Sequence, residues 1–165
     1  SLMADIKESA YRDHLTGLYN RRYFYQYAER VLKNVEQDNV LALLDIDFFK
    51  NINDQFGHEA GDQALKQVAS FLKRKFDDFT VARIGGEEFA VVLNNMDLEK
   101  AQPKLNTFRE QLAEHAFSIN GEPYSLTMSI GITKFHKVSL TAAMRTADKA
   151  LYQAKQQSRN CLVQL

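Results

Sequence analysis

The sequence has one cysteine, no net charge and no long apolar run, and each of these features excludes a class of protein. The single Cys161 excludes an intrachain disulfide and is typical of a reducing compartment. The 21 basic and 21 acidic residues balance, so bulk charge does not support binding to nucleic acid or to an anionic membrane. No apolar stretch approaches the roughly 20 residues that cross a bilayer, and no secretory signal is visible. We therefore expect a cytoplasmic domain without direct membrane contact.

The sequence also lacks several site motifs that are common in enzymes. None of the four histidines occurs in a His-Glu-x-x-His string or with paired cysteines, which argues against zinc. Neither the Gly-x-x-x-x-Gly-Lys-Ser/Thr loop that binds phosphates nor the Gly-x-Ser-x-Gly nucleophile elbow is present. Any nucleotide chemistry must therefore come from another arrangement of residues.

The pattern of apolar residues predicts one α/β domain. With 165 residues, 45% of them hydrophobic and 25% charged, the chain is long enough to bury a core. Periodicity predicts helices over residues 22–35, 48–56, 61–76, 98–116 and 140–157, and strands over 40–46, 79–82, 89–93, 117–119, 124–133 and 161–165. The order β-α-α-β-β-α-β-β-α-β after the first helix predicts an α/β (α+β) sandwich, with a mixed central β-sheet and helices on both faces.

Residues 1–12 are expected to lie outside this domain, which we place at 13–165. Residues 3–11 carry a weak helical stripe that is too short to be stable alone. We interpret it as the end of a linker helix that arrives from an upstream sensor module, and a membrane anchor in that upstream part stays open. Ser1 and Leu2, which precede Met3, are interpreted as an expression remnant.

A glycine pair followed by two acids is the most informative stretch of the chain. Gly85 and Gly86 lie between two apolar runs, which predicts a hairpin whose turn uses the positive φ that glycine accepts. Glu87 and Glu88 follow directly. The common interpretation of such a string is a solvated turn with two surface acids. A second acidic strand end, at residues 45–47, favours a functional interpretation.

The two acidic strand ends could together hold a metal ion. Asp45 ends a buried strand and Glu87 follows the glycine turn, so the two carboxylates converge if their strands are neighbours. Two carboxylates with few other ligands are typical of Mg²⁺, which takes its remaining ligands from water and substrate phosphates. The alternative for Asp45 is a capping acid for the next helix, and we expect Asp47 to be that helix's N-cap.

The helix after Asp47 could bind phosphate. Free amides at a helix N-terminus attract anions, and Lys50 could add positive charge. We expect the side chains of Phe48 and Phe49 to belong to the core, while their backbone remains available to a ligand.

Five blocks of residues, in order, carry a resemblance to one family. They are residues 13–22 (DHLTGLYNRR), 45–54 (DIDFFKNIND) with Gly57-His58 and Gly61-Asp62, 85–89 (GGEEF), 129–131 (SIG) and 147–155 (ADKALYQAK) followed by Arg159-Asn160. These blocks resemble the motifs of the GGDEF family, the diguanylate cyclases, in its GGEEF form. The similarity extends from about Asp13 to Val163. It implies a palm-like core, similar to that of nucleotidyl cyclases and polymerases.

The resemblance implies a reaction and its partners. Diguanylate cyclases condense two GTP into cyclic di-GMP and two pyrophosphates. Each domain holds one GTP with Mg²⁺, or with Mn²⁺ in its place, and the 3′-hydroxyl of one GTP attacks the α-phosphate of the other. Two copies of the domain must therefore face each other, and we expect their association to be transient here.

The resemblance also implies roles for individual residues. Asp45, Glu87 and Glu88 are the catalytic acids, and Asp45, the Ile46 carbonyl and Glu87 are the metal ligands. Glu88 either activates the 3′-hydroxyl or positions the metal. The residues implied in nucleotide binding are Phe48, Phe49, Lys50, Asn53, His58, Asp62, Gly85, Gly86, Lys155 and Arg159.

Two pairs among these residues have plain alternatives. Asp62 can accept hydrogen bonds from guanine N1–H and its amine and would disfavour adenine, with Asn53 beside it. The alternative is that Asp62 is an ordinary aspartate at the start of a helix and Asn53 an ordinary asparagine on a helix surface. Lys155 and Arg159 are four apart, which predicts one helix face toward the triphosphate. They could equally be cations at a helix C-terminus, and Ser158 stands where the family usually has glycine.

One departure from the family concerns product inhibition. Many members carry Arg-x-x-Asp just before the signature, where product binds, whereas those positions here hold Phe76 and Phe79. Arg74 and Asp77 have the right spacing but lie two positions early. We therefore expect the usual inhibitory site to be absent. The alternatives for the whole domain are a catalytically inactive module that binds GTP or a cyclic dinucleotide, and a cyclase that uses ATP or mixed substrates.

Overall fold

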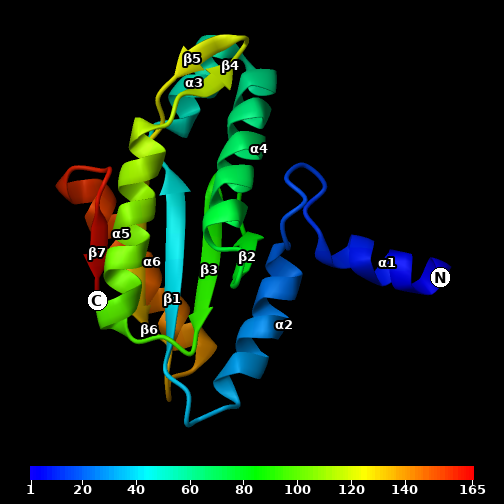
Figure 1. Cartoon of the computed structure of the whole chain (residues 1–165), viewed down its shortest axis with the longest axis vertical. Helices are drawn as coiled ribbons and strands as arrows, with labels where there is room; N and C mark the ends of the chain where they lie inside the picture. Colours follow the sequence, from blue (N-terminus) through cyan, green and yellow to red (C-terminus); the bar gives the residue numbers. More distant parts are fainter.

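The computed structural model describes residues 1–165, with the exception of the side chain of Lys7. A five-stranded sheet forms its centre (Figure 1). Its strands, in spatial order, are β2 (Thr80–Arg83), β3 (Glu88–Asn94), β1 (Asn39–Ile46), β6 (Met128–Lys134) and β7 (Leu162–Gln164). Neighbouring strands are antiparallel except β6 and β7, which are parallel. The predicted mixed sheet is therefore confirmed.

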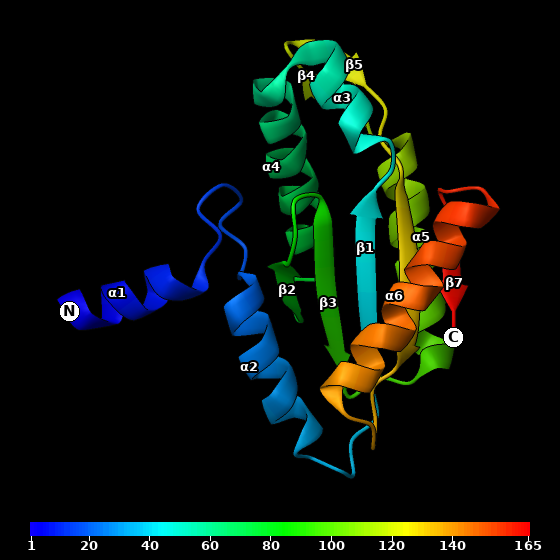
Figure 2. The same ribbon diagram turned by 180° about the vertical axis from the view of Figure 1, so that it is seen from behind.

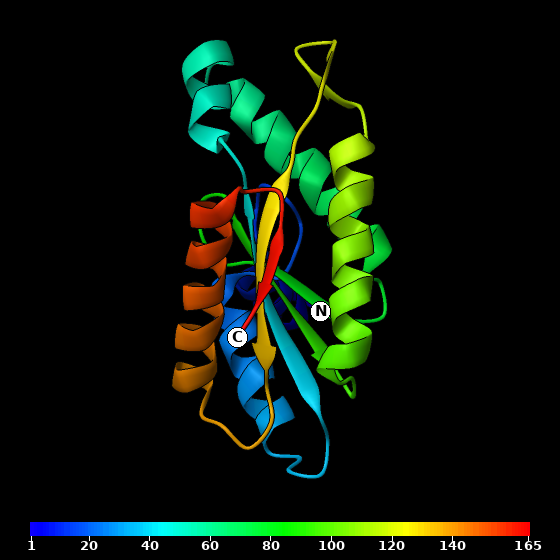
Figure 3. The same cartoon turned by 90° about the vertical axis from the view of Figure 1, so that its left-hand side faces the viewer.

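Helices cover both faces of this sheet, as predicted. On one face, α2 (Arg21–Leu32) and α6 (Leu140–Gln157) pack on Leu41 and Leu43 of β1. On the other, α4 (His58–Lys75) and α5 (Leu98–Glu114) pack on the alternate residues of the same strand. Figure 3 shows α6 and α5 on opposite sides of the sheet. All eight residues of β1 are buried, because both faces of a central strand are covered.

The second predicted hairpin is present, but its second strand is shorter than predicted. Asn120 and Gly121, with φ of 52° and 81°, form the turn between β4 (Phe117–Ile119) and β5 (Glu122–Tyr124). The strand predicted over 124–133 is therefore wrong as one unit. The chain leaves the hairpin after β5 and re-enters the main sheet as β6. In Figures 1 and 2 the small hairpin lies beyond the end of the sheet, and the ring of Tyr124 on β5 contacts Phe56 of α3 (Phe49–Phe56) edge-on.

The helix that follows β1 is not capped by Asp47, which corrects that prediction. The residue before α3 is Phe48, in the left-handed conformation, and it makes no side-chain capping bond. The next helix begins earlier than predicted, at His58 rather than at residue 61, because Gly57 at φ 91° both ends α3 and begins α4.

The first helix, α1 (Leu2–Tyr11), projects away from the sheet and its covering helices (Figure 2). Its apolar side chains Leu2, Met3 and Ile6 are exposed. Its last residue, Tyr11, contacts the ring of Tyr23 on α2 edge-on. Within the residues that the structure describes, no helix is both long and apolar enough to cross a membrane.

Candidate active site

The two acidic strand ends meet at one end of the sheet. In the antiparallel register of β1 and β3, Asp45 lies directly opposite Glu88. Residues opposed in this way point to the same face of the sheet. Just beyond this pair, the N–H of Ile46 donates to the carbonyl of Glu87 over 3.3 Å. The structure therefore brings together carboxylates that are far apart in the sequence.

A cleft of about 260 Å³ opens at this meeting point. Its lining combines the acids with cations and with the first turn of α3, and consists of Asp45, Ile46, Asp47, Phe48, Phe49, Lys50, Asn51, Glu87, Lys155 and Arg159. Inside it, Lys155 Nζ donates to Asp45 Oδ2 over 2.7 Å. Eight of the residues implied in the site line one cleft. Glu88, Asn53, His58, Asp62, Gly85 and Gly86 are not part of its lining.

The carboxylates of the site carry negative charge that the protein neutralises only in part. Burial raises the pKa of Asp45 more than the Lys155 ammonium lowers it. Burial and the neighbouring Asp45 also raise the pKa of Glu87. Hard oxygen donors in such a setting suit a divalent cation. Among the described residues no three His, Cys, Asp or Glu side chains gather as metal ligands, so a cation would need the Ile46 carbonyl, water or substrate as further ligands.

Glu88 does not line the cleft, and the charges that act on it include Asp148 of α6 and Arg21 of α2. Burial first, and then the charges of Asp148 and Asp45, raise its pKa to about 7. The cations Lys155 and Arg21 oppose this shift. Asp148 and Arg21 had no predicted role. Both belong to the family-like blocks, but neither block pattern says which side chains face Glu88.

Phe48 does not take the place that was predicted for it. Phe49 is buried, as expected, but Phe48 is 58% exposed and has φ 56°, which is unusual for a bulky residue. The guanidinium of Arg159 lies over its ring, 4.6 Å from the centroid. The prediction that both rings belong to the core is wrong for Phe48, because its left-handed backbone turns the ring outward.

Arg159 reaches the cleft by a route that the sequence did not indicate. Helix α6 ends at Gln157, and Arg159 follows in the left-handed region at φ 53°. Such a conformation costs a non-glycine residue roughly 1–2 kcal/mol. Lys155 and Arg159 therefore do not share a helix face, which corrects that expectation, although both line the cleft. Ser158 has φ −155° and ψ −3°, so the residue in the usual glycine position needs no positive φ.

The glycine turn is present between β2 and β3, but not for the predicted reason. The N–H groups of Ile84 and Gly85 donate to the carbonyl of Glu88 over 2.9 and 3.3 Å. Neither Gly85 nor Gly86 has a positive φ. Both are exposed, and a Cβ placed on Gly86 would meet no atom within 4 Å. Glycine at this tip therefore leaves open space over the backbone, as close approach by a ligand would require.

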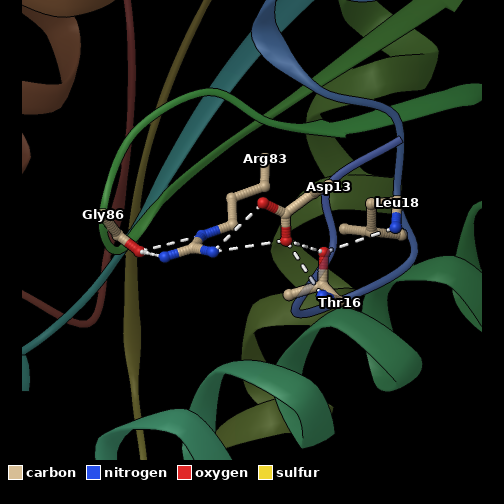
Figure 4. A network of polar contacts seen from close by, with 5 residues as sticks. All are labelled: Asp13, Thr16, Leu18, Arg83 and Gly86. Atoms are coloured by element: carbon tan, nitrogen blue, oxygen red, sulfur yellow. Dashed lines mark hydrogen bonds and ion pairs between the residues drawn. The ribbon is translucent and has the colours of Figure 1, made fainter. Parts of the chain in front are cut away.

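An ion pair that sequence reasoning missed holds this turn in place (Figure 4). Arg83 donates from Nη2 and Nε to the carbonyl of Gly86 over 2.8 and 3.1 Å. Its Nη1 donates to both carboxylate oxygens of Asp13 over 3.2 Å. The N–H and hydroxyl of Thr16 also donate to Asp13. Both partners lie in or beside family-like blocks, but 70 residues separate them and no spacing rule connects them.

The residues predicted to read guanine gather at the far side of α3. Asn53 of α3 lies against Gly61 of α4 so closely that a methyl group on this glycine would overlap its Oδ1. Asp62 is the next residue and is exposed, as is His58 at the start of α4. Asn53 is one helical turn beyond Phe49, roughly 6 Å along the axis. A nucleotide lying along α3 could therefore reach from these residues to the cleft.

Comparison with known proteins identifies the family. A sequence model described as "Diguanylate cyclase, GGDEF domain" matches residues 10–161. The chain belongs to the GGDEF family of diguanylate cyclases. Diguanylate cyclase DgcP of Pseudomonas aeruginosa is 42% identical over 98% of this chain and 25% of its own length. Diguanylate cyclase A of Treponema denticola is 37% identical over 95% of this chain and 45% of its own. The chain thus spans less than half the length of these GGDEF relatives.

Solved GGDEF structures share the fold. The coiled coil and GGDEF domain of DgcB from Caulobacter crescentus, in complex with c-di-GMP, has a TM-score of 0.93 at 29% identity and covers 99% of this chain and 90% of its own. SiaD from Pseudomonas aeruginosa, in complex with its activator SiaC, has a TM-score of 0.91 at 34% identity. The match covers 99% of this chain and 65% of SiaD's chain. The active GGEEF domain of a diguanylate cyclase from Vibrio cholerae has a TM-score of 0.78 at 34% identity. The match covers 88% of this chain and 96% of that domain's chain. The predicted family and palm-like fold are confirmed.

Proposed function

We propose that this GGDEF domain condenses two GTP molecules into cyclic di-GMP and two pyrophosphates. The observation that carries the proposal is the cleft in which Asp45 and Glu87 meet Lys155 and Arg159. Acids for a metal and cations for phosphates, side by side, are the groups that phosphoryl transfer requires. The family membership and the sequence identity to named diguanylate cyclases support the same reaction.

The donor set fits a divalent cation. The carboxylates of Asp45 and Glu87 and the carbonyl of Ile46 would hold Mg²⁺, or Mn²⁺ in its place, which would supply a Lewis acid that polarises phosphoryl oxygens. Lys155 and Arg159 bind and orient the triphosphate, and the N-terminus of α3 at Phe48–Lys50 adds its favourable dipole. The protein's main contribution is to position the reacting groups.

The guanine base would lie along α3, beside Asn53 and Asp62. The carboxylate of Asp62 accepts from guanine N1–H and the exocyclic amine, whereas adenine presents an acceptor at N1. His58, Gly85 and Gly86 are exposed around this path and leave room for the nucleotide. Glu88 lies opposite Asp45 but does not line the cleft, so we infer that it positions the glycine turn and the metal-binding acids.

Each domain holds one GTP in this scheme, so the reaction needs a second copy of the domain facing the first. The chain spans a quarter and under half of two of its relatives, which supports a sensor module in the rest of the full-length protein. In one structural neighbour an activator protein is bound to the cyclase, and a regulated assembly is proposed here by analogy.

The proposal is tested by incubating the protein with GTP and Mg²⁺ and detecting cyclic di-GMP by mass. Turnover should stop on chelation of the metal, and excess ATP should not compete, because Asp62 disfavours adenine. The alternative, an inactive module that binds GTP or cyclic di-GMP, is favoured if the protein binds either molecule tightly and releases no pyrophosphate at any protein concentration.

A further inference from the structure

Asp47 makes a set of buried contacts beside the metal-binding acids. It is 4% exposed. Its carboxylate accepts hydrogen bonds from the hydroxyls of Thr127 and Ser129 over 2.7 and 2.6 Å, and from the N–H of Asn160 over 2.8 Å. One side chain therefore ties the end of β1 to the start of β6 and to the loop after α6.

Asn160 is held from the opposite side by α5. Arg109 donates from Nη1 to the backbone carbonyl of Asn160 over 3.0 Å and to its Oδ1 over 2.7 Å. The Nε of Arg109 donates to Asn106 over 2.9 Å, and the Arg109 side chain is only 14% exposed. The backbone N–H and C=O of Asn160 thus contact two fixed charges of opposite sign, from two different elements.

These contacts determine where the preceding residue lies. Arg159 and Asn160 both have positive φ, 53° and 42°, and neither is a glycine. Such a pair persists only where its surroundings hold it. The Arg159 guanidinium then rests over the ring of Phe48, the residue next to Asp47. Fixing Asn160 therefore fixes the direction in which Arg159 enters the cleft.

We propose that Asp47 and Arg109 are positioning residues that hold Arg159 in place for the phosphates of the nucleotide. This inference rests on the proposed function, because it assigns the phosphates to the cleft. Asp47 lines the cleft, but its carboxylate already accepts three hydrogen bonds from the protein, so in this scheme neither residue binds the nucleotide. Arg109 lies on the opposite face of the sheet from α6, so the scheme extends the phosphate site to α5.

A double-mutant cycle on binding separates positioning from simple stabilisation. The probe is 3′-deoxy-GTP with Mg²⁺, which lacks the attacking hydroxyl, and affinity is measured by calorimetry. We expect Asp47→Asn and Arg109→Gln each to weaken binding about tenfold, the scale of one lost charge-assisted contact. In the Arg159→Ala background, either change should add little, because the side chain that it positions is gone.

The matched control is Asn39→Ser at the opposite end of β1. Asn39 is 1% exposed, accepts from Gln37 and the N–H of Asn95, and donates to the carbonyls of Phe135 and Gln37. Its loss should lower the melting temperature as much as Asp47→Asn does and leave the affinity for 3′-deoxy-GTP unchanged.

Effects that multiply in the double variants, or an Asp47→Asn variant with wild-type affinity, would overturn the inference. An equal loss of affinity in Asn39→Ser would overturn it too, because loosening of the fold would then explain the result. Failure of the proposed function has a different signature: the wild type binds 3′-deoxy-GTP but forms no cyclic dinucleotide from GTP.

Discussion

Individual residues of the site sit in environments that the fold alone would not favour. The raised pKa values of Asp45, Glu87 and Glu88 all begin with burial, and the neighbouring acids add to it. Each such shift means that the folded state disfavours the charged carboxylate. The grouped carboxylates therefore favour binding of a cation in the cleft and lower the stability of the folded state without one, which is a common property of functional sites.

Glu88 should make this cost visible as a pH dependence of stability. Its pKa rises from an ordinary 4.5 to about 7. Below 4.5 both states hold the proton, between these values only the folded state does, and stability therefore falls as pH rises through this window. The side chain of the Glu88→Gln variant stays uncharged at every pH. We therefore expect its melting temperature to be higher than that of the wild type at pH about 8 and equal to it at pH about 4.

The measurement is thermal unfolding in a chelator, because a bound cation would change the balance of charge. Glu29→Gln, an exposed acid on α2, serves as the control and should show no such divergence. Parallel melting curves for Glu88→Gln and the wild type across the range would contradict the assignment.

Sequence reasoning found the residue types of the site but not their conformations. Asp45 and Glu87 could be paired in advance because each marks a strand end. The left-handed backbones of Phe48, Arg159 and Asn160 could not, since non-glycine residues reach this region only where tertiary contacts hold them. Asp47 was mistaken for a cap because its partners lie about 80 and 113 residues away.

Two glycines, one on β6 and one in the turn between β2 and β3, separate the effect of packing from the effect on function. A methyl group on Gly131 of β6 would overlap the backbone of Leu151 and Ala147 on α6, whereas one on Gly86 would meet nothing. Backbone atoms cannot move aside cheaply, so we expect Gly131→Ala to cost about 3 kcal/mol and to lower Tm by roughly 10 °C. Gly86→Ala should keep its Tm and lose GTP turnover, because the methyl group occupies the path of the nucleotide. A Gly86→Ala variant with full activity would contradict the proposed path.

The turn that carries Asp13 links the start of the domain to the glycine turn. Burial alone would raise the pKa of Asp13, but hydrogen bonds from Thr16 and the charge of Arg83 outweigh it, so the pKa lies below 3.8. A lowered pKa means stability that is present above 3.8 and lost as pH falls. We expect Asp13→Asn to cost about 1–2 kcal/mol at neutral pH, and less in acid. It should also slow turnover by freeing Gly86.

Denaturant unfolding at neutral and acidic pH measures this cost. Glu8→Gln removes an ion pair to Arg12 whose acid is 60% exposed, so it should change stability by less than about 0.5 kcal/mol. An Asp13→Asn cost that does not shrink in acid would contradict the account.

The end of α4 bears on product inhibition. Phe76 is buried, at 1% exposure. Arg74 is exposed, and its Nε donates a hydrogen bond to the carbonyl of Ser70. A buried ring cannot contact product phosphates. We therefore expect initial rates to be unaffected by low micromolar cyclic di-GMP. Inhibition at that level that disappears in Arg74→Ala would show that Arg74 replaces the usual arginine.

At the scale of the whole molecule, the fold was largely predictable. The alternation of buried strand patterns with helical periods determined the layers, because each apolar face must be covered. The prediction of a single strand over 124–133 was wrong, because apolar periodicity does not show where a chain leaves one sheet and enters another. The weak helical stripe over residues 3–11 does not show what α1 packs against, because so short a helix is not stable alone.

The reaction should depend on encounters between whole domains. Since each copy holds one nucleotide, turnover per molecule should rise with protein concentration until the domains associate. The most direct test measures cyclic di-GMP formed from GTP and Mg²⁺ by the wild type and by Asp45→Asn across protein concentration. The account predicts concentration-dependent turnover by the wild type and a loss of at least about 100-fold in the variant, which keeps its fold but lacks a metal ligand. Equal turnover by the two proteins, or none by a folded wild type at any concentration, would contradict it.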